Sequence, residues 1–134
     1  MPKLRHVALQ VKDPETTAAF FEEAFEMKRI GRTDAGISHG IYLSDGTINL
    51  AILHFKTDEA AGVPDGKDFV GINHIGFWVE DLKEIDEKIV EAGGKAFLNQ
   101  DEPENDTLFF EKKYHNPDGI VFDVSKTGWG GAKK

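Results

Sequence analysis

The sequence contains no cysteine among its 134 residues. Disulfide frameworks, thiolate metal sites and cysteine nucleophiles are therefore excluded. Basic residues are also scarce, because 16 lysines and arginines face 24 acidic residues and leave a formal net charge of −8. Nucleic-acid binding requires clustered basic side chains, which this sequence does not have. Any metal ion must be bound by nitrogen and oxygen ligands, and we expect a small molecule as the partner.

Long hydrophobic runs are missing as well. No stretch approaches the ~20 apolar residues that a membrane-spanning helix requires. The first residues, Met1 to Leu4, lead directly into a strand pattern rather than into a signal peptide. We therefore expect no membrane partner and a cytoplasmic location. The hydrophobic content of 40% is enough for the core of one domain of this length.

Two segments of the chain resemble each other. They run from Leu4 to Asp13 and from Ile72 to Asp81, and each contains a histidine 7 positions before its aspartate. In both, the intervening residues alternate as in a half-buried strand, and the aspartate precedes a helical pattern. A repeat of this length indicates an internally duplicated fold. We predict a single domain over residues 1–134, with modules at about 4–55 and 72–125, a polar connector at 56–71 and a tail at 126–134.

Each module is expected to have the element order βαβββ. Helices are predicted from Pro14 to Met27 and from Leu82 to Ala92, where apolar residues recur at helical spacing after a capping aspartate. The predicted strands are Arg5 to Val11, Arg29 to Thr33, Ser38 to Leu43, Thr47 to Phe55, a strand ending at Val79, Lys95 to Asn99, Leu108 to Tyr114 and Ile120 to Ser125. The tail is expected to be flexible or docked on a partner.

Strand parity sorts the candidate functional residues, because residues two apart share a face and the helices must cover the apolar one. This rule places His6, His74, Asp123 and Asn49 on the face away from the helices. The predicted fold class is α+β, in which the two βαβββ modules form curled mixed sheets around a concave pocket with the helices outside. The residues expected to line the pocket are Ala8, Gln10, Ala51, Leu53, Gly76, Trp78 and Val121.

The two histidines and the aspartate on this face form a candidate metal site. Two neutral imidazoles and one carboxylate suit a divalent ion of iron, manganese, zinc, nickel or cobalt, and the pattern does not identify which. Because three ligands leave coordination positions open, an oxygen of a substrate can bind the ion and be polarised. His6, His74 and Asp123 are therefore the predicted ligands.

These residues resemble the vicinal oxygen chelate superfamily. It includes glyoxalase I, extradiol dioxygenases, methylmalonyl-CoA epimerase, fosfomycin-resistance thiol transferases and bleomycin-binding proteins. The resemblance spans about residues 4 to 125. It is carried by the segments Leu4 to Val11, Ile72 to Phe77 and Asn116 to Asp123. The resemblance implies a ligand carboxylate four residues after Gly119, where Asp123 takes the place of the more common glutamate.

Two positions differ from what the resemblance implies. Asn49 stands where glyoxalase I has a carboxylate, so it is expected to be a weak fourth ligand or a substrate contact. Lys113 stands where the extradiol dioxygenases have a tyrosine beside the metal. Tyr114, one position on, is expected to point to the other face. His115 is therefore the nearest candidate for a catalytic proton carrier.

The resemblance leaves two classes of function open. The first is a metal-dependent enzyme that chelates vicinal oxygens of a small substrate, either a lyase or isomerase or an extradiol ring-cleaving dioxygenase. The second is a metal-free protein of the bleomycin-resistance type that binds an antibiotic or another small molecule. The resemblance also implies a homodimer, and in some of the families that it resembles the site is shared between two chains.

Overall fold

The computed structural model describes residues 1–98, 101–105 and 107–134. Asn99, the expected last residue of one strand, lies outside the described residues. The described part contains helices α1 (Pro14–Phe25), α2 (Asp58–Ala61) and α3 (Leu82–Glu91) and a 3₁₀ turn at Gly66–Asp68. Its strands are β1 (Lys3–Gln10), β2 (Lys28–Ala35), β3 (Ser38–Ser44), β4 (Asn49–Phe55), β5 (Gly71–Trp78), β6 (Lys95–Phe97), β7 (Lys112–His115) and β8 (Val121–Ser125).

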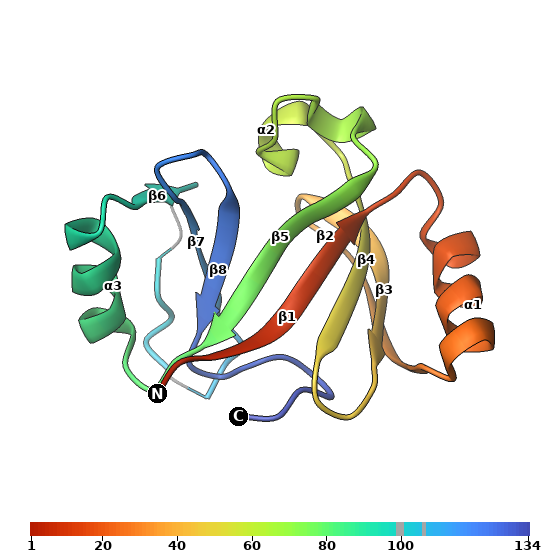
Figure 1. Ribbon diagram of the computed structural model, residues 1–134, viewed down its shortest axis with the longest axis horizontal. Coiled ribbons are helices and arrows are strands. Elements are labelled where there is room, and N and C mark those ends of the chain that lie inside the picture. Colours follow the sequence, from red (N-terminus) through yellow and green to blue (C-terminus); the bar gives the residue numbers. More distant parts are fainter. Residues whose placement is uncertain (99–100, 106) are drawn as a thin grey trace.

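The described strands form one curled sheet of eight strands in the order β2-β3-β4-β1-β5-β8-β7-β6. The sheet does not close on itself, and α1 and α3 lie outside it at opposite ends (Figure 1). β1 pairs in parallel with β4, and β5 pairs in parallel with β8. The antiparallel pairing of β1 with β5 joins the two halves. The predicted α+β fold with outer helices is confirmed, and the pairing of β1 with β5 makes the two expected sheets continuous.

Local signals explain the positions of the two long helices. The side chain of Asp13 accepts a hydrogen bond from the backbone N–H of Glu15, and Asp81 does the same for Glu84. These contacts satisfy backbone donors that the first turn of a helix leaves unpaired. The covered faces of α1 and α3 then pack on opposite ends of the sheet. Buried residues of the first core are Val11, Ala18, Ile41, Leu43 and Ile52, and those of the second are Val79, Tyr114 and Val124.

Two stretches differ from the sequence prediction. The connector contains α2, whose first turn is capped by the Thr57 hydroxyl at the N–H of Ala60. β7 begins at Lys112 rather than Leu108. The reason is visible at Phe110, whose backbone N–H and carbonyl bond the side chains of Thr127 and Ser125 instead of a neighbouring strand.

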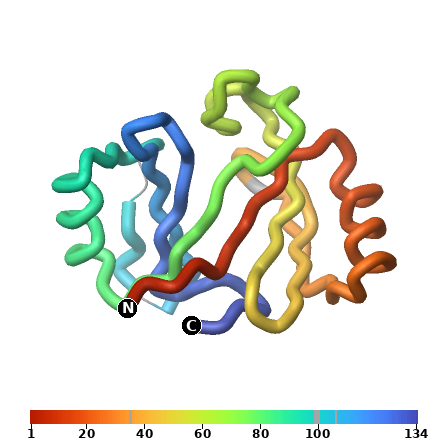
Figure 2. The backbone as a smooth tube through the Cα atoms, in the orientation of Figure 1, coloured from red at the N-terminus to blue at the C-terminus, as the bar shows by residue number. Residues whose placement is uncertain are grey.

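The C-terminal tail, residues 126–134, packs against its own chain. The backbone N–H of Lys133 donates to the carbonyl of Thr47, and Arg5 donates to the carbonyl of Lys133. The Ser44 hydroxyl donates to the carbonyl of Gly131. Figure 2 shows this segment crossing from the end of β8 to the hairpin between β3 and β4. The expectation of a flexible or partner-docked tail is therefore wrong, because its backbone groups are bonded within the chain.

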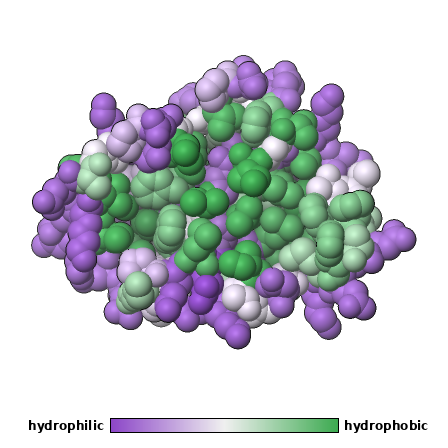
Figure 3. All heavy atoms as spheres, in the orientation of Figure 1, coloured by the Kyte–Doolittle hydropathy of each residue, from purple (hydrophilic) through white to green (hydrophobic). Residues whose placement is uncertain are grey.

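One face of the molecule has a concentration of apolar side chains. Figure 3 shows them gathered across the middle of the view, over the strands that cross there in Figure 1. Leu4 on β1 is 43% exposed and Ile72 on β5 is 63% exposed, which is unusual for large apolar residues in a sheet. Within the described ranges, no helix is long and apolar enough to cross a membrane.

Candidate metal centre

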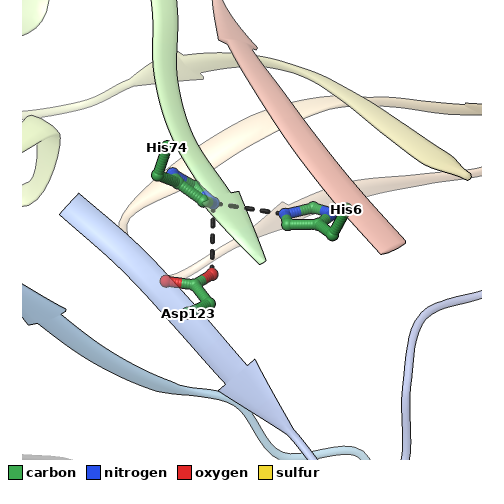
Figure 4. Close-up of side chains that lie close together, drawn as sticks. All are labelled: His6, His74 and Asp123. Carbon is green, nitrogen blue, oxygen red and sulfur yellow. Dashed lines mark hydrogen bonds and ion pairs between the residues drawn. The ribbon is translucent and has the colours of Figure 1, made fainter. Parts of the chain in front are cut away.

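The middle of the sheet brings His6, His74 and Asp123 together. β1 carries His6, β5 beside it carries His74, and β8 on the other side of β5 carries Asp123. Gly76 lies opposite both His6 and Asp123 in the strand register. A β-carbon at Gly76 would lie 2.9 Å from that of His6. The nearest atoms to such a β-carbon belong to the Trp129 ring at 2.8 Å, so the glycine makes room for that ring beside His6. Figure 4 shows the side chains of His6, His74 and Asp123 converging.

The three side chains point their ligand atoms at one another. Nε2 of His6 lies 3.2 Å from Nε2 of His74, and that atom lies 3.1 Å from Oδ2 of Asp123. All three ligand atoms lie within 4.8 Å of one another, and all three residues are buried. Two atoms bound to one ion at about 2.1 Å lie about 3.0 to 3.4 Å apart in octahedral or tetrahedral geometry. The spacing around His74 fits that range.

Neighbouring amides fix which nitrogen of each imidazole carries the proton. Asn49 donates from Nδ2 to the carbonyl of Gly130, so its Oδ1 faces Nδ1 of His6 at 2.8 Å. Asn73 donates from Nδ2 to Gln10, so its Oδ1 faces Nδ1 of His74 at 2.7 Å. An amide oxygen only accepts, so each imidazole donates from Nδ1. Each ring then presents Nε2 as a bare lone pair.

This tautomer pattern places two nitrogen lone pairs and a carboxylate oxygen face to face. Burial lowers the pKa of His6 to about 3, and burial also lowers the pKa of His74. Both rings are therefore neutral near pH 7, and neither carries a proton to donate across the gap. Outer hydrogen bonds that hold Nδ1–H and expose Nε2 are the arrangement typical of metal-bound histidines. The donor set fits a divalent cation.

Lys113 on β7 already contacts the carboxylate of Asp123. Its Nζ lies 2.9 Å from both Oδ1 and Oδ2, and the two side chains are 5% and 0% exposed. Burial alone would raise the pKa of Asp123, but the neighbouring His74 and the positive charge of Lys113 outweigh burial and hold that pKa below its ordinary value. Asp123 is therefore an anion whose charge is balanced by Lys113.

A second carboxylate, Glu111, stands beside this ion pair. Oε2 of Glu111 accepts a hydrogen bond of 2.8 Å from Nε1 of Trp129, and its Oε1 lies 3.8 Å from Nζ of Lys113. Burial, followed by the negative charge of Asp123, raises the pKa of Glu111 to about 7. The sequence prediction missed this residue, although strand parity was a signal for it, since Glu111 lies two positions before Lys113 in the predicted strand Leu108 to Tyr114.

Trp129 covers one side of His6. Their rings are stacked with centroids 4.7 Å apart and an interplanar angle of 3°, and Trp129 is 7% exposed. The next residue, Gly130, supplies the carbonyl that orients Asn49. The tail therefore holds His6 by two routes, through the stack and through the amide. Sequence reasoning missed both, since they join residues more than 80 positions apart.

A cavity of about 940 Å³ opens beside the three residues. It is lined by His6, Thr33, Gly36, Ile37, Ser38, Tyr42, Asn49, Ala51, Leu53, Phe55, His74, Leu98, Asp101, Phe109, Phe110, Glu111, Lys113, Trp129 and Gly130. Two of the expected wall residues, Ala51 and Leu53, are in this set. Asn49 lines the cavity too, but both ends of its amide are engaged, which differs from the free side chain expected of a fourth ligand.

The other expected wall residues lie elsewhere. Gln10 is buried and donates to the carbonyl of Gly66 beneath the connector. The indole of Trp78 donates to the carbonyl of Lys126, and the Trp129 ring lies over Gly76. Ala8 and Val121 are buried at 0% and 2% exposure and are outside the cavity lining. The connector and the tail explain the difference, since both cover sheet surface that strand parity alone leaves open.

His115, the expected proton carrier, is also outside the cavity lining. Its Nε2 lies 3.3 Å from the carbonyl of Gly62, and its ring packs edge-on against Phe97. It shares the face of Lys113 but lies at the end of β7, under the end of α2. Tyr114 points to the helix side, as expected, and stacks on Phe122.

The comparison with protein families decides which family the chain represents. Residues 3–124 match the model of the glyoxalase, bleomycin resistance protein and dioxygenase superfamily. The chain belongs to this superfamily. The match spans all eight strands except the last residue of β8 and ends before the tail, so Trp129 lies outside the part that the superfamily defines.

Solved structures of other proteins show the same fold. A hypothetical protein from Bacillus halodurans is 19% identical, with a TM-score of 0.73 over 99% of this chain and 95% of that chain. A methylmalonyl-CoA epimerase variant from Streptomyces coelicolor, in complex with 2-nitronate-propionyl-CoA, is 16% identical, with a TM-score of 0.73 over 92% and 95%. The methylmalonyl-CoA epimerase from Mycobacterium tuberculosis is 14% identical, with a TM-score of 0.72 over 91% and 85%. No curated protein sequence matches the chain.

Within the superfamily repeat, the strand register clarifies the place of Asn49. In the second half His74 pairs with Val121, and Asp123 lies two residues further along β8. In the first half His6 pairs directly with Asn49, so the position equivalent to Asp123 is Ala51. The carboxylate of Asp123 in the second half therefore has the methyl group of Ala51 as its counterpart in the first half.

Proposed function

We propose that this protein is a divalent-metal enzyme of the vicinal oxygen chelate type, with His6, His74 and Asp123 as the ligands. The observation that carries the proposal is the convergence of two bare Nε2 atoms and one carboxylate oxygen at spacings of 3.1 and 3.2 Å. Three acceptors in a buried site repel one another unless a cation lies among them. The cavity beside them gives a small substrate access to the open positions of such an ion.

Among the metal-dependent reactions of the superfamily, we favour a lyase or isomerase that moves a proton. A bound divalent ion would act as a Lewis acid on substrate oxygens and make adjacent C–H groups more acidic. Glu111 is the residue placed to hold or take that proton, because it lines the cavity and Trp129 fixes its carboxylate. Lys113 lies against Asp123 and keeps it anionic.

Metal analysis of the purified protein tests the proposal. We expect close to one divalent ion per chain in protein prepared without chelators. In His74→Ala that ion is expected to be lost, with a larger drop in affinity than the roughly 10- to 100-fold effect of removing an outer hydrogen-bond partner. His54→Ala is a matched control, since His54 bonds the carbonyl of Val11 away from the site. Correctly folded protein that binds no divalent ion would refute the proposal.

Asn49→Leu tests how His6 is held. The leucine keeps the approximate size of the side chain but removes the acceptor for Nδ1–H of His6 and the donor to Gly130. We expect metal affinity to fall by about 10- to 100-fold, because the imidazole loses the partner that fixes its tautomer and orientation. Isothermal titration of the metal-free protein measures this. Unchanged affinity would mean that the amide does not support the ligand.

Two measurements separate the candidate reactions. Proton transfer is expected to appear as exchange of a substrate C–H proton with deuterated solvent, and to be slowed in Glu111→Gln. An extradiol dioxygenase would instead consume oxygen with catechols when loaded with Fe(II). We rank ring cleavage below proton transfer, because Lys113 occupies the position at which the extradiol dioxygenases have a tyrosine.

A metal-free binder is the alternative function, and one observation favours it. The Lys113 ammonium already neutralises Asp123 at 2.9 Å without any added cation. A protein that binds its ligand in the cavity without a metal would need only this ion pair. The metal analysis decides between the two functions, because the binder predicts that the correctly folded native protein takes up no divalent ion.

The homodimer that the family resemblance implies stays a prediction. The exposed apolar side chains in Figure 3, together with Phe20 and Phe25 on α1 at 60% and 66% exposure, offer surfaces that a second chain could cover. All three proposed ligands converge within one chain. Sedimentation at micromolar concentration is expected to give twice the chain mass of 14.9 kDa. A mass of one chain would rule the homodimer out at that concentration.

A further inference from the structure

The lining of the cavity indicates the kind of molecule that fits it. Aromatic side chains reach it from β3, β4, the segment before β7 and the tail. They are Tyr42, Phe55, Phe109, Phe110 and Trp129. Aromatic rings attract other rings through stacked and edge-on contacts, beyond the benefit of burying apolar area. A cavity with rings on several sides therefore favours a ligand that contains a ring.

The charges around the cavity argue against an anionic ligand. Among the described residues that line it, Lys113 is the one cationic side chain, and Asp123 holds both of its short contacts. Asp101 and Glu111 bring carboxyl groups to the same lining. The residues outside the description, Asn99, Gln100 and Asp106, include no lysine or arginine. In the metal-free protein a phosphate would therefore find no cation beyond the Lys113 ammonium already paired with Asp123, and the net charge of −8 adds to its repulsion.

The cavity lining also contains neutral polar groups. Thr33, Ser38 and Tyr42 contribute hydroxyl groups from β2 and β3. Hydroxyl groups can donate to or accept from hydroxyl and carbonyl groups of a ligand without requiring charge. We propose that the cavity binds an uncharged aromatic small molecule that carries hydroxyl or carbonyl oxygens, and that it does not accept a phosphorylated or CoA-linked ligand. This inference rests on the proposed function only in using the same cavity.

Three probes of one skeleton test the inference on the metal-free protein. 2-Naphthol is neutral and aromatic, 2-naphthyl phosphate adds an anion, and decahydro-2-naphthol keeps the size but removes the aromatic rings. We expect 2-naphthol to bind at least about tenfold more tightly than either of the others, measured by isothermal titration. Preference for the phosphate would overturn the charge argument, and equal binding of the saturated alcohol would overturn the aromatic one. Absence of 2-naphthol binding would overturn the whole inference.

A pair of phenylalanine variants locates the binding. Phe110→Ala removes a ring from the cavity lining, whereas Phe25→Ala removes a ring that is 66% exposed on α1 and outside the lining. We expect about tenfold weaker 2-naphthol binding in the first variant and no change in the second. Equal effects would contradict the assignment. Because the metal-free protein serves for these titrations, failure of the metal proposal would leave this result intact, and failure of probe binding would leave the metal result intact.

Discussion

Lys113→Met is expected to lower the free energy of unfolding of the metal-free protein by about 3–5 kcal/mol, the cost of removing one partner from a buried ion pair. The variant keeps the length of the apolar stem but leaves both Asp123 oxygens without their contacts at 2.9 Å. Asp123 is 0% exposed, so water cannot replace the ammonium group. Denaturant unfolding after treatment with a chelator measures the change.

The same variant is expected to bind divalent ions more tightly. Lys113 competes for the oxygens of Asp123, and its positive charge repels a cation held by His6, His74 and Asp123. Removing the ammonium group ends both the competition and the repulsion, and both changes raise the affinity for the ion. Each 1.4 kcal/mol of lost repulsion corresponds to a tenfold gain in affinity. Saturating metal is therefore expected to restore part of the lost stability.

Lys112→Met is the matched control for both results. Lys112 is the preceding residue on β7 and contacts Asp86 at 2.8 Å, but the two side chains are 31% and 38% exposed. Pairs this accessible to water contribute less than about 1 kcal/mol. We expect a small change in stability and no change in metal affinity. Equal destabilisation by the two variants would show that Lys113 does not act through the buried carboxylate.

Glu111→Gln is expected to change how the stability of the metal-free protein depends on pH. Burial raises the pKa of Glu111 from 4.5 to about 7 in the folded state. Between these values the folded protein holds a proton that the unfolded chain has released, so stability falls as pH rises from 4.5 to 7 and then levels off. The full effect is on the order of 2–3 kcal/mol, after allowing for the partial exposure of the side chain.

The glutamine cannot titrate. Between pH 5 and pH 8 the free energy of unfolding is therefore expected to fall less in the variant than in the native protein, and the difference is the contribution of Glu111. His6 and His74 act in the opposite direction, because their lowered pKa values make stability fall as pH falls below 6.5. They remain in both proteins and cancel in the comparison. Thermal unfolding across this range measures the difference. Parallel curves for the two proteins would contradict the raised pKa of Glu111.

Much of the ligand set could be predicted from the sequence for a simple reason. The side-chain period of a strand is two, so the alternation around His6, His74 and Asp123 places each on the face opposite the helices. The repeated histidine and aspartate pattern then indicates that the strands carrying the histidines are equivalent. Their convergence also needed β5 to lie between β1 and β8, which the register of Gly76 with His6 and with Asp123 records.

The surroundings of the ligands depend on contacts that leave no local pattern. Trp129 reaches His6 from the tail, and its indole donates a hydrogen bond to the carboxylate of Glu111. His115 differs in the opposite way. It lies on the same face of β7 as Lys113, but the end of α2 covers it and keeps it out of the cavity lining. Coverage by distant segments is decided by packing, which strand parity does not report.

The sequence by itself determined the α+β fold, the superfamily and the shared face of His6, His74 and Asp123, because periodicity and repeats are properties of neighbouring residues. Only the tertiary structure decided that Lys113 neutralises Asp123, that Asn49 supports His6 and that the tail walls the cavity with Trp129. These contacts join residues that are far apart in the sequence. They form only when the sheet has curled and the tail packs across it, so no pattern of neighbouring residues predicts them.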